Sequence, residues 1–444
     1  MDAISEKITV IDAMCGSGKT SWIIDRMNRE NKQWIYIAPY LDEVERIIKA
    51  CPKRSFKQPR AYQENGQKVT KSEDLFRLVK AGANIASTHE LFKRLTEETT
   101  NMLRLQNYSL VLDEVLEIVE PVRLKPATTK LMFDKGFLQK EDIKGSKSGV
   151  HCRSGIIKKV VAGDDAGLES FLMKGDQGLV SFNHLKRWAD NDRLVWVNSS
   201  MLLWLMPASV FNAFDEIYNL TYLFEGSYQK TYYDLHGIDF DYRSVTKDGR
   251  NYRLIDYDLE DDLAKRSKLR SRLNVYDGTL NAIGNPNSAM SLNWWIKKGF
   301  KSKREDIMRK TVYNFLANIL HSSKNKAMWT CFEANKDKIK PNGYASCWVP
   351  FNQRATNLYR CKHDLAFLVN RFIQPMIDNY FRAFNFTVNE GMFALSELVQ
   401  WLFRSALRDG EPINLYLPSG RMRSLLFAWL NDSIEAKVIV EPIN

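Results

Sequence analysis

Short apolar runs alternate with longer segments of helical periodicity through the first half of the chain. The runs that predict strands cover residues 8–11, 34–38, 83–87, 109–112, 194–198 and 216–224. Parallel strands need long crossover connections, which are usually helices, so this alternation is typical of βαβ units. We therefore predict an α/β fold with a doubly wound parallel sheet, whose ligands bind at the carboxyl ends of the strands.

Two polar stretches interrupt the alternation, which then resumes. Residues 134–192 are rich in Lys, Gly, Ser and Asp, and residues 242–303 are irregular and polar. Beyond them the pattern predicts helices over 307–322, 359–372 and 395–408, and strands over 327–332, 345–349 and 413–417. The domains that we expect are a first domain over 1–225 with an insertion at about 134–192, a connector over 226–305, and a second α/β domain over 306–444.

A glycine-rich loop joins the first predicted strand to the first predicted helix. It reads A-M-C-G-S-G-K-T over residues 13–20. The glycines allow backbone N–H groups to converge on an anion, and the helix N-terminus behind them favours negative charge. In this pattern the lysine reaches the β- and γ-phosphates and the threonine hydroxyl holds Mg²⁺. The residues that we expect to bind a nucleoside triphosphate are Gly16, Ser17, Gly18, Lys19 and Thr20, although Ala13 stands where the pattern usually has its first glycine.

The strand predicted over 109–112 ends in two adjacent carboxylates, Asp113 and Glu114. A nucleotide hydrolase needs this arrangement, with Asp113 holding Mg²⁺ and Glu114 orienting and deprotonating the attacking water. The alternative is a solvated acidic pair at the start of a helix. Because the pair follows a phosphate-binding loop in the same predicted sheet, we favour the functional interpretation.

Two other strand ends carry groups that suit a phosphodiester backbone. The strand over 34–38 runs into Pro39, and the strand over 83–87 runs into Thr88. Short hydroxyls and exposed backbone at strand ends are typical phosphate contacts. Ordinary loops are the alternative for each of them.

In the second half, Gln400, Arg404 and Arg408 are spaced i, i+4 and i+8. On a helix these three side chains would share one face. Two arginines there could project at a triphosphate held by the other domain and neutralise the charge that develops in phosphoryl transfer. A basic surface stripe is the alternative.

These motifs resemble those of the superfamily 2 helicases and translocases, of a DEAD-like, phage or mobile-element type. Residues 13–20 resemble motif I, and Asp113-Glu114 resembles motif II, with Val-Leu after it in place of Ala-Asp or Ala-His. Gln400, Arg404 and Arg408 resemble motif VI, with the second arginine one residue later than usual. The weaker matches are 38–40 to motif Ia, 87–89 to the DNA-contact motif that follows it, Thr356-Asn357 to motif V, and 220–222 or else 199–200 to motif III.

The resemblance implies two RecA-like domains that bind ATP and Mg²⁺ in the cleft between them. It implies that Glu114, Gln400, Arg404 and Arg408 are catalytic. It also implies that nucleic acid lies across both domains, on Pro39, Thr88, Thr356 and Asn357.

Charge and cysteine content narrow the class of protein further. A net charge of +11 fits an anionic polymer, and we expect nucleic acid, DNA rather than RNA, with replication proteins as further candidate partners. None of the six cysteines forms a C-x-x-C pair, which argues against a zinc site or a disulfide framework and indicates the cytoplasm. No apolar run reaches about 18 residues, so we expect no membrane insertion.

The sequence therefore predicts an ATP-dependent helicase or translocase that acts in phage replication or recombination. A first rival class is a nucleic-acid-stimulated ATPase that recognises origins, loads or remodels without unwinding. A packaging ATPase joined to a nuclease is a second rival class, and a small-molecule phosphotransferase is a third.

Overall fold

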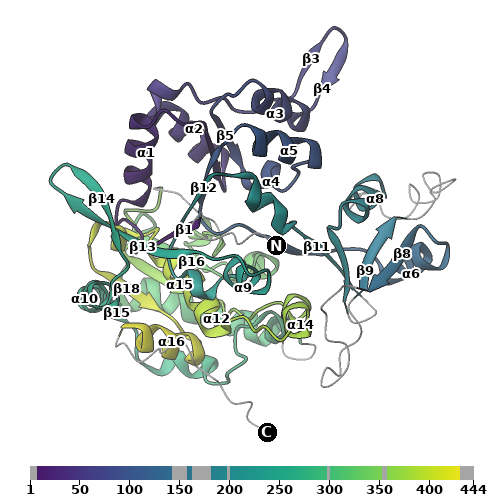
Figure 1. Ribbon diagram of the computed structural model, residues 1–444. Coiled ribbons are helices and arrows are strands. Elements are labelled where there is room, and N and C mark those ends of the chain that lie inside the picture. The colour runs from purple at the N-terminus through teal and green to yellow at the C-terminus, as the bar shows by residue number, and fades with distance from the viewer. Residues whose placement is uncertain are drawn as a thin grey trace.

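In the computed structural model, the described residues form two mainly parallel sheets, a five-stranded antiparallel sheet and a two-stranded hairpin (Figure 1). The structure describes residues 8–142, 158–162, 182–197, 201–297, 301–352 and 358–430. The fold is α/β, as the alternation of apolar runs and helical segments predicted. Within the described residues, no helix is both long and apolar enough to cross a membrane.

The first sheet has seven strands in the order β14-β13-β1-β12-β6-β2-β5, and only the β13–β14 pair is antiparallel. Its strands are Ile8–Asp12 (β1), Trp34–Ala38 (β2), Ile85–Thr88 (β5), Ser109–Asp113 (β6), Glu216–Thr221 (β12), Asp241–Asp248 (β13) and Asn251–Asp256 (β14). Alternate residues of β2 belong to two separate apolar clusters, so both faces of the sheet are buried. This explains why its central strands are nearly continuous apolar runs.

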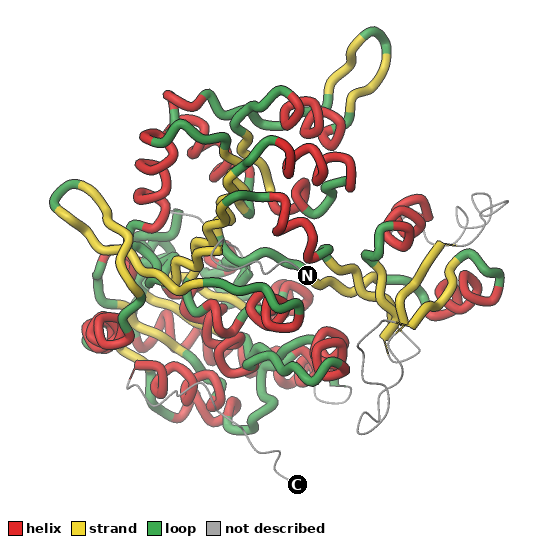
Figure 2. The backbone as a smooth tube through the Cα atoms, in the orientation of Figure 1, coloured by secondary structure: helices red, strands yellow, loops and turns green. Residues whose placement is uncertain are grey.

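Helices and one small hairpin connect these strands. The connecting helices are Lys19–Arg29 (α1), Leu41–Ala50 (α2), Lys71–Lys80 (α3), His89–Phe92 (α4), Glu97–Leu105 (α5) and Tyr228–Leu235 (α9). The hairpin of Tyr62–Glu64 (β3) and Gln67–Val69 (β4) projects from the body, as Figure 2 shows. Five of the six strands predicted in the first half lie in this sheet.

The sixth predicted strand, over 194–198, lies instead in a five-stranded antiparallel sheet of order β7-β11-β10-β9-β8. Its strands are Val119–Val122 (β7), Leu138–Asp142 (β8), Lys158–Ala162 (β9), Leu194–Val197 (β10) and Met201–Leu205 (β11), and its helices are Pro126–Asp134 (α6) and Phe182–Asp190 (α8). A local apolar run does not reveal which strand it pairs with, and β10 pairs with β11 as a hairpin. The insertion therefore extends from residue 119 to 205, beyond the predicted 134–192, and stands to the side of the body in Figure 1.

The second parallel sheet has the order β15-β18-β17-β16. Its strands are Leu273–Val275 (β15), Ala327–Thr330 (β16), Asp364–Phe367 (β17) and Ile413–Tyr416 (β18). Its helices are Leu259–Arg270 (α10), Leu292–Ile296 (α11), Lys301–Tyr313 (α12) with a π-helical turn over Asn314–Ile319, Lys336–Ile339 (α13), Pro375–Ala383 (α14), Glu390–Leu402 (α15) and Gly420–Leu430 (α16).

Several elements of the second half differ from their predictions. The helix predicted over 359–372 contains strand β17, because a short apolar run that is buried on both faces has no period that separates strand from helix. The strand predicted over 345–349 is a 3₁₀ turn over Ala345–Cys347. The connector predicted over 226–305 is divided, because β13 and β14 extend the first sheet while β15 joins the second.

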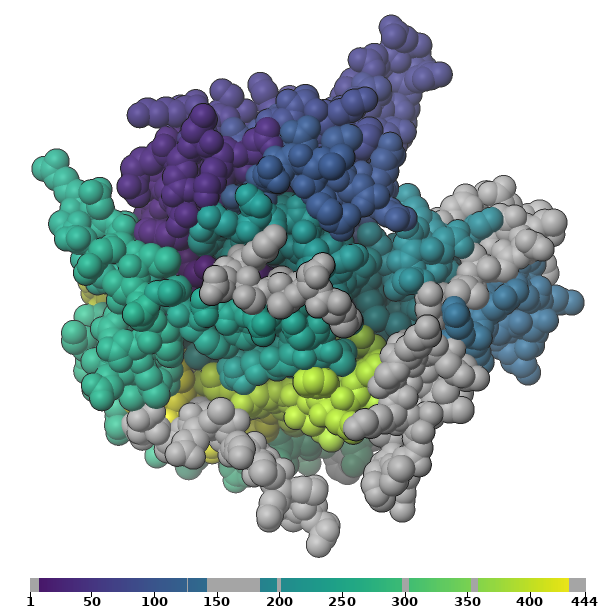
Figure 3. Space-filling model, viewed as in Figure 1, coloured from purple at the N-terminus to yellow at the C-terminus, as the bar shows by residue number. Residues whose placement is uncertain are grey.

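The two halves share apolar cores. Met14, in the loop after β1, packs in the cluster of the second sheet, and α14 packs in the main cluster of the first sheet. Figure 3 shows the middle of the chain, in teal, between the purple N-terminal part and the yellow-green C-terminal part. The N-terminal and C-terminal parts of the chain therefore each contribute side chains to the apolar core of the other half.

Gly226, in the turn after β12, packs against the backbone of helix α15 in the other half. A Cβ atom on Gly226 would lie 2.4 Å from the backbone carbon of Met392 in α15, where neither backbone can yield cheaply. We predict that Gly226→Ala lowers the free energy of unfolding by about 2 kcal/mol through overpacking. Urea unfolding would measure this change.

The matched control is Gly391→Ala in α15, the helix that Gly226 contacts. The atom nearest to a Cβ on Gly391 is the side-chain Cδ2 of Leu425, at 3.3 Å, and this side chain can move. We expect Gly391→Ala to change stability by less than about 0.5 kcal/mol. Equal losses in the two variants would contradict this account of the interface.

Candidate nucleotide site between the two parallel sheets

One cavity of about 230 Å³ brings together four segments that are distant in the sequence. They are the glycine-rich loop after β1, the N-terminal part of α2, the end of β6, and the end of α15 with the turn that follows it. Tyr252 of β14 closes the cavity from the side. The lining residues are Cys15, Gly16, Gly18, Lys19, Thr20, Ser21, Glu43, Arg46, Asp113, Glu114, Tyr252, Gln400, Phe403, Arg404 and Arg408.

The glycine-rich loop curls around the Lys19 ammonium. Gly16 and Gly18 have φ of +85° and +98°, in the left-handed region that favours glycine. Lys19 Nζ donates to the carbonyls of Ala13 and Met14, the latter at 3.2 Å. Ser17 does not line the cavity, but its N–H donates to the Met14 carbonyl at 3.1 Å and closes the turn.

Gly18 is also constrained by its neighbour in space. A Cβ atom there would lie 2.0 Å from the Tyr252 ring, so the β13–β14 hairpin packs directly against the loop. Gly18 is the N-cap residue of α1, and Thr20 is in the first turn of this helix. The loop therefore offers backbone N–H groups, a helix N-terminus and a lysine to one anion.

Asp113 and Glu114 face the loop from the end of β6. The Tyr36 hydroxyl donates to Asp113 Oδ2 at 2.7 Å, and burial, with Glu114 adding to it, raises the pKa of Asp113 to about 7. Glu114 has a φ of +68°, which is uncommon for a residue with a side chain, and its N–H donates to the Leu220 carbonyl at 2.9 Å. Backbone strain of this kind clusters at functional sites.

The arginine segment differs from the predicted single helix. Helix α15 ends at Leu402, because the Ser405 hydroxyl donates to the Leu402 carbonyl at 2.6 Å and accepts from the Leu407 N–H at 3.3 Å. A 3₁₀ helix over Ala406–Asp409 follows. The prediction that Gln400, Arg404 and Arg408 share a helix face is therefore wrong, yet all three line the cavity.

The two arginines have different surroundings. Arg404 is 4% exposed, and its Nη1 donates to the carbonyls of Pro350 and Phe351, both at 3.0 Å. Arg408 is exposed. Its carbonyl oxygen and Cγ would lie 3.8 and 3.9 Å from a Cβ atom added to Gly16. Arg408 thus lies against the glycine-rich loop, while Arg404 holds the segment over 350–351.

The oxygen atoms at this cavity suit Mg²⁺, which takes hydroxyl, carboxylate and phosphate oxygens. The Thr20 hydroxyl and the Asp113 carboxylate come from neighbouring parts of the same lining. Lys19 and Arg408 add positive charge from the two sides. The residues present therefore fit a magnesium–triphosphate ligand.

The predicted nucleic-acid contacts are only partly within the described residues. Pro39 follows β2 and Thr88 ends β5, and the register of these neighbouring strands pairs Ala38 with Thr88. Both positions therefore lie at the carboxyl edge of the first sheet, the edge that carries the glycine-rich loop. Thr356 and Asn357 lie outside the described residues, as do residues 199–200, the second motif III candidate.

The preferred motif III candidate, residues 220–222, lies between the two phosphate-site motifs. The Leu220 carbonyl accepts from Glu114, and the Thr221 carbonyl accepts from the Ala13 N–H at 3.1 Å. Strand β12 therefore joins the glycine-rich loop to the carboxylate pair.

Sequence reasoning missed Tyr36, which is bonded to Asp113, and several lining residues, among them Glu43, Arg46 and Tyr252. Arg46 pairs with Glu43 at 2.6 Å on α2, and Glu43 and Arg46 both line the cavity. The sequence does show Tyr36 as a residue with a hydroxyl group in an otherwise apolar predicted strand. The Asp248-Gly249 turn signals a hairpin, but no local signal indicates that its Tyr252 packs on Gly18.

One family model matches within the second half of the chain. Residues 267–430 match a family model described as the YonV C-terminal Rossmann-like domain, which begins near the end of α10 and contains the whole second sheet. A solved structure titled "Structure of S. tokodaii Xpd4" matches over 97% of this chain and 95% of that chain, with 11% identity and a TM-score of 0.46. That likeness is weak.

The chain is also similar to the SPbeta prophage-derived uncharacterized protein YonV of Bacillus subtilis (strain 168). The two are 37% identical over 429 residues, which cover 96% of this chain and 99% of that protein. Identity at this level over nearly the full length of both chains shows the family, and the chain belongs to the YonV family.

Proposed function

We propose that this protein is an ATP-dependent helicase or translocase that acts on nucleic acid, with DNA favoured over RNA. The observation that carries the proposal is the shared cavity. A glycine-rich loop with its lysine, an Asp-Glu pair at a strand end, and an arginine from the 3₁₀ helix after α15 line the same 230 Å³ space. These are the groups that phosphoryl transfer from a nucleoside triphosphate requires.

Each side chain has a defined role in this proposal. Lys19 places its positive charge on the phosphoryl group that is transferred. When bound, Mg²⁺ would be held by Thr20 and Asp113 and would neutralise phosphate charge. Glu114, which lines the cavity, orients the attacking water and accepts its proton.

The second half of the chain supplies the groups that complete the site. Arg408 lies beside Gly16 and stabilises the charge that develops on the phosphates, and Gln400 contributes a polar group from α15. Arg404 positions the segment over 350–351 through two backbone carbonyls. Closure across this cavity when ATP binds, and reopening after hydrolysis, would drive movement along a strand.

Two observations support nucleic acid as the track. The net charge of +11 favours a polyanion, and Pro39 and Thr88 lie on neighbouring strand ends at the edge that carries the ATP site. Phosphate contacts of this kind make binding dependent on salt and largely independent of sequence.

A second candidate is a nucleic-acid-stimulated ATPase that loads or remodels without processive unwinding. The shared apolar cores favour it, because Met14 and α14 each pack in the core of the opposite half and limit large separations of the two sheets. Strand-separation assays on forked and blunt duplexes distinguish the two candidates. Only the first candidate predicts ATP-dependent release of a strand.

We predict that Lys19→Ala lowers ATP hydrolysis by a factor of about 100 or more, because the transferred phosphoryl group loses the positive charge of the lysine beside it. A steady-state phosphate-release assay would measure this. Lys53→Ala, an exposed lysine outside the cavity, is the control and should retain normal turnover. Normal turnover in Lys19→Ala would remove the basis of the proposal.

We predict that Arg408→Ala and Arg404→Ala fail in different ways. Arg408 is exposed beside the loop, so its loss should lower turnover by about 100-fold or more with an unchanged urea midpoint. Arg404 is buried, so its loss should also lower the free energy of unfolding by about 1–3 kcal/mol, because two carbonyls lose their donor.

Turnover and urea unfolding of both variants, measured side by side, check this distinction. Unchanged turnover in Arg408→Ala would show that Arg408 does not act on the phosphates. Unchanged stability in Arg404→Ala would contradict its role in holding residues 350–351.

A further inference from the structure

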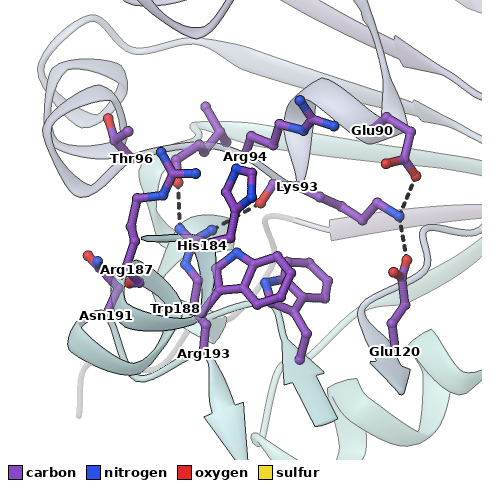
Figure 4. A pocket seen from close by; sticks show the side chains of 12 residues that line it. Glu90, Lys93, Arg94, Thr96, Glu120, His184, Arg187, Trp188, Asn191 and Arg193 are labelled. Atoms are coloured by element: carbon purple, nitrogen blue, oxygen red, sulfur yellow. Dashed lines mark hydrogen bonds and ion pairs between the residues drawn. The ribbon is translucent and has the colours of Figure 1, made fainter. Parts of the chain in front are cut away.

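A second cavity, of about 350 Å³, lies between the first sheet's α4 region and helix α8 of the insertion (Figure 4). It shares no residue with the nucleotide site. Its lining residues are Glu90, Lys93, Arg94, Leu95, Thr96, Glu120, His184, Arg187, Trp188, Asn191, Arg193 and Trp204. Its volume is in the range of cavities that hold a small ligand or a single nucleotide.

Three arginines gather at this cavity, and none has a carboxylate partner among the described residues. Arg94 and Arg187 are exposed and neither forms an ion pair there, and Arg193 is 6% exposed. Burial, and then the charges of Arg187 and Arg94, lower the pKa of His184. Burial, and then Arg187, lower the pKa of Arg193 to about 10. The fold thus holds several like charges close together, an arrangement that an anion would relieve.

The acidic groups of the cavity are already paired. Lys93 forms ion pairs with Glu90 and Glu120 and lies 3.7 Å from Glu117. Figure 4 shows this group on the side of the cavity away from Arg187 and Arg193. Lys93 offsets one of these three negative charges. The lining itself contains two carboxylates, Glu90 and Glu120, against one lysine and three arginines, so it keeps a net positive charge.

An aromatic surface lies among the arginines. Trp188 is half-buried, its ring stacks on His184 with a centroid distance of 6.1 Å and an interplanar angle of 24°, and Trp204 lies 6.4 Å away. Trp204 is 4% exposed, so Trp188 offers the more accessible ring. Cations that surround an accessible aromatic face suit single-stranded nucleic acid, because every base has a face that can stack.

Helix α4, which contributes Glu90 to this second cavity, is also hydrogen-bonded to a residue that lines the nucleotide site. Helix α4 begins at His89, whose Nε2 donates to the Asp113 carbonyl at 3.0 Å. It ends beside Lys93 and Leu95, whose carbonyls accept from the Arg193 guanidinium at 3.0 and 2.6 Å. A contiguous set of contacts therefore runs from the proposed ATP site to the arginine cavity.

We propose that this cavity binds single-stranded nucleic acid, with Arg94 and Arg187 on successive phosphates and one base stacked on Trp188. The proposal rests on the proposed function, because it names a strand-binding site for the same motor. It also gives the insertion a role, since α8 covers a nucleic-acid strand that passes along the carboxyl edge of the first sheet.

The test measures binding of fluorescently labelled single-stranded DNA and RNA oligonucleotides to the full chain by anisotropy, over a range of salt concentrations. For the double variant Arg94→Ala/Arg187→Ala we expect at least tenfold weaker binding at low salt. We also expect a salt dependence shallower by about 0.7 per lost phosphate contact. The matched control is Arg104→Ala, an exposed arginine of α5 outside the cavity, which should bind as the unmodified protein does.

The aromatic contact needs its own variants. Trp188→Ala should weaken oligonucleotide binding about tenfold, and Trp188→Phe should restore most of it, because base stacking contributes at about this level and needs only a ring. A Trp188→Ala protein that binds normally while the arginine variant binds weakly would overturn base stacking. The same assay with a polyglutamate peptide tests for an acidic protein partner. If the unmodified protein binds this peptide and the arginine variant loses peptide binding as much as it loses oligonucleotide binding, the site belongs to an acidic protein partner instead.

Failure of this proposal and failure of the proposed function give different results. If the unmodified protein binds oligonucleotides and the cavity variants match Arg104→Ala, the strand site is overturned and the motor proposal stands. If the unmodified protein hydrolyses ATP but binds neither DNA nor RNA, both the strand site and the nucleic-acid part of the proposed function are overturned.

Discussion

A buried carboxylate at the end of β1 fixes the turn after β12, which in turn packs against the second half of the molecule. Asp12 is 8% exposed, and its two oxygens accept from the N–H groups of Leu223 and Phe224 at 2.7 and 3.0 Å. Those bonds shape the turn after β12, where Leu223 has a φ of +60° and Gly226 meets the first turn of α15. The far end of α15 then returns to the cavity with Gln400. The strand that precedes the glycine-rich loop thus also helps to position the helix that faces this loop.

Much of the first half could be predicted because its signals are local. A strand, a glycine-rich loop with Lys19, and a helix are read from adjacent residues, and the apolar run that ends at Asp113 is equally direct. In parallel sheets the carboxyl ends meet at one edge, so the proximity of Lys19 and Asp113 followed from topology alone. The structure describes both at one cavity.

The rest depends on contacts between distant segments. The run Asp364–Phe367 is buried on both faces and lacks a period, so it was predicted as helix although it forms a central strand. The Ser405 hydroxyl ends α15 early, and this changed how Arg408 reaches the loop. No local pattern places Tyr252 on Gly18, or α8 beside α4, because those positions are set by sheet pairing and by the insertion.

The central claim is that the cavity between the two parallel sheets hydrolyses ATP in response to a nucleic-acid strand. The most direct measurement is the rate of ATP hydrolysis by the unmodified protein alone and with single-stranded DNA, duplex DNA or RNA at saturating concentration. The account predicts hydrolysis that rises severalfold or more with a single-stranded polymer. Absence of hydrolysis under all four conditions, or a rate indifferent to every polymer, would contradict it.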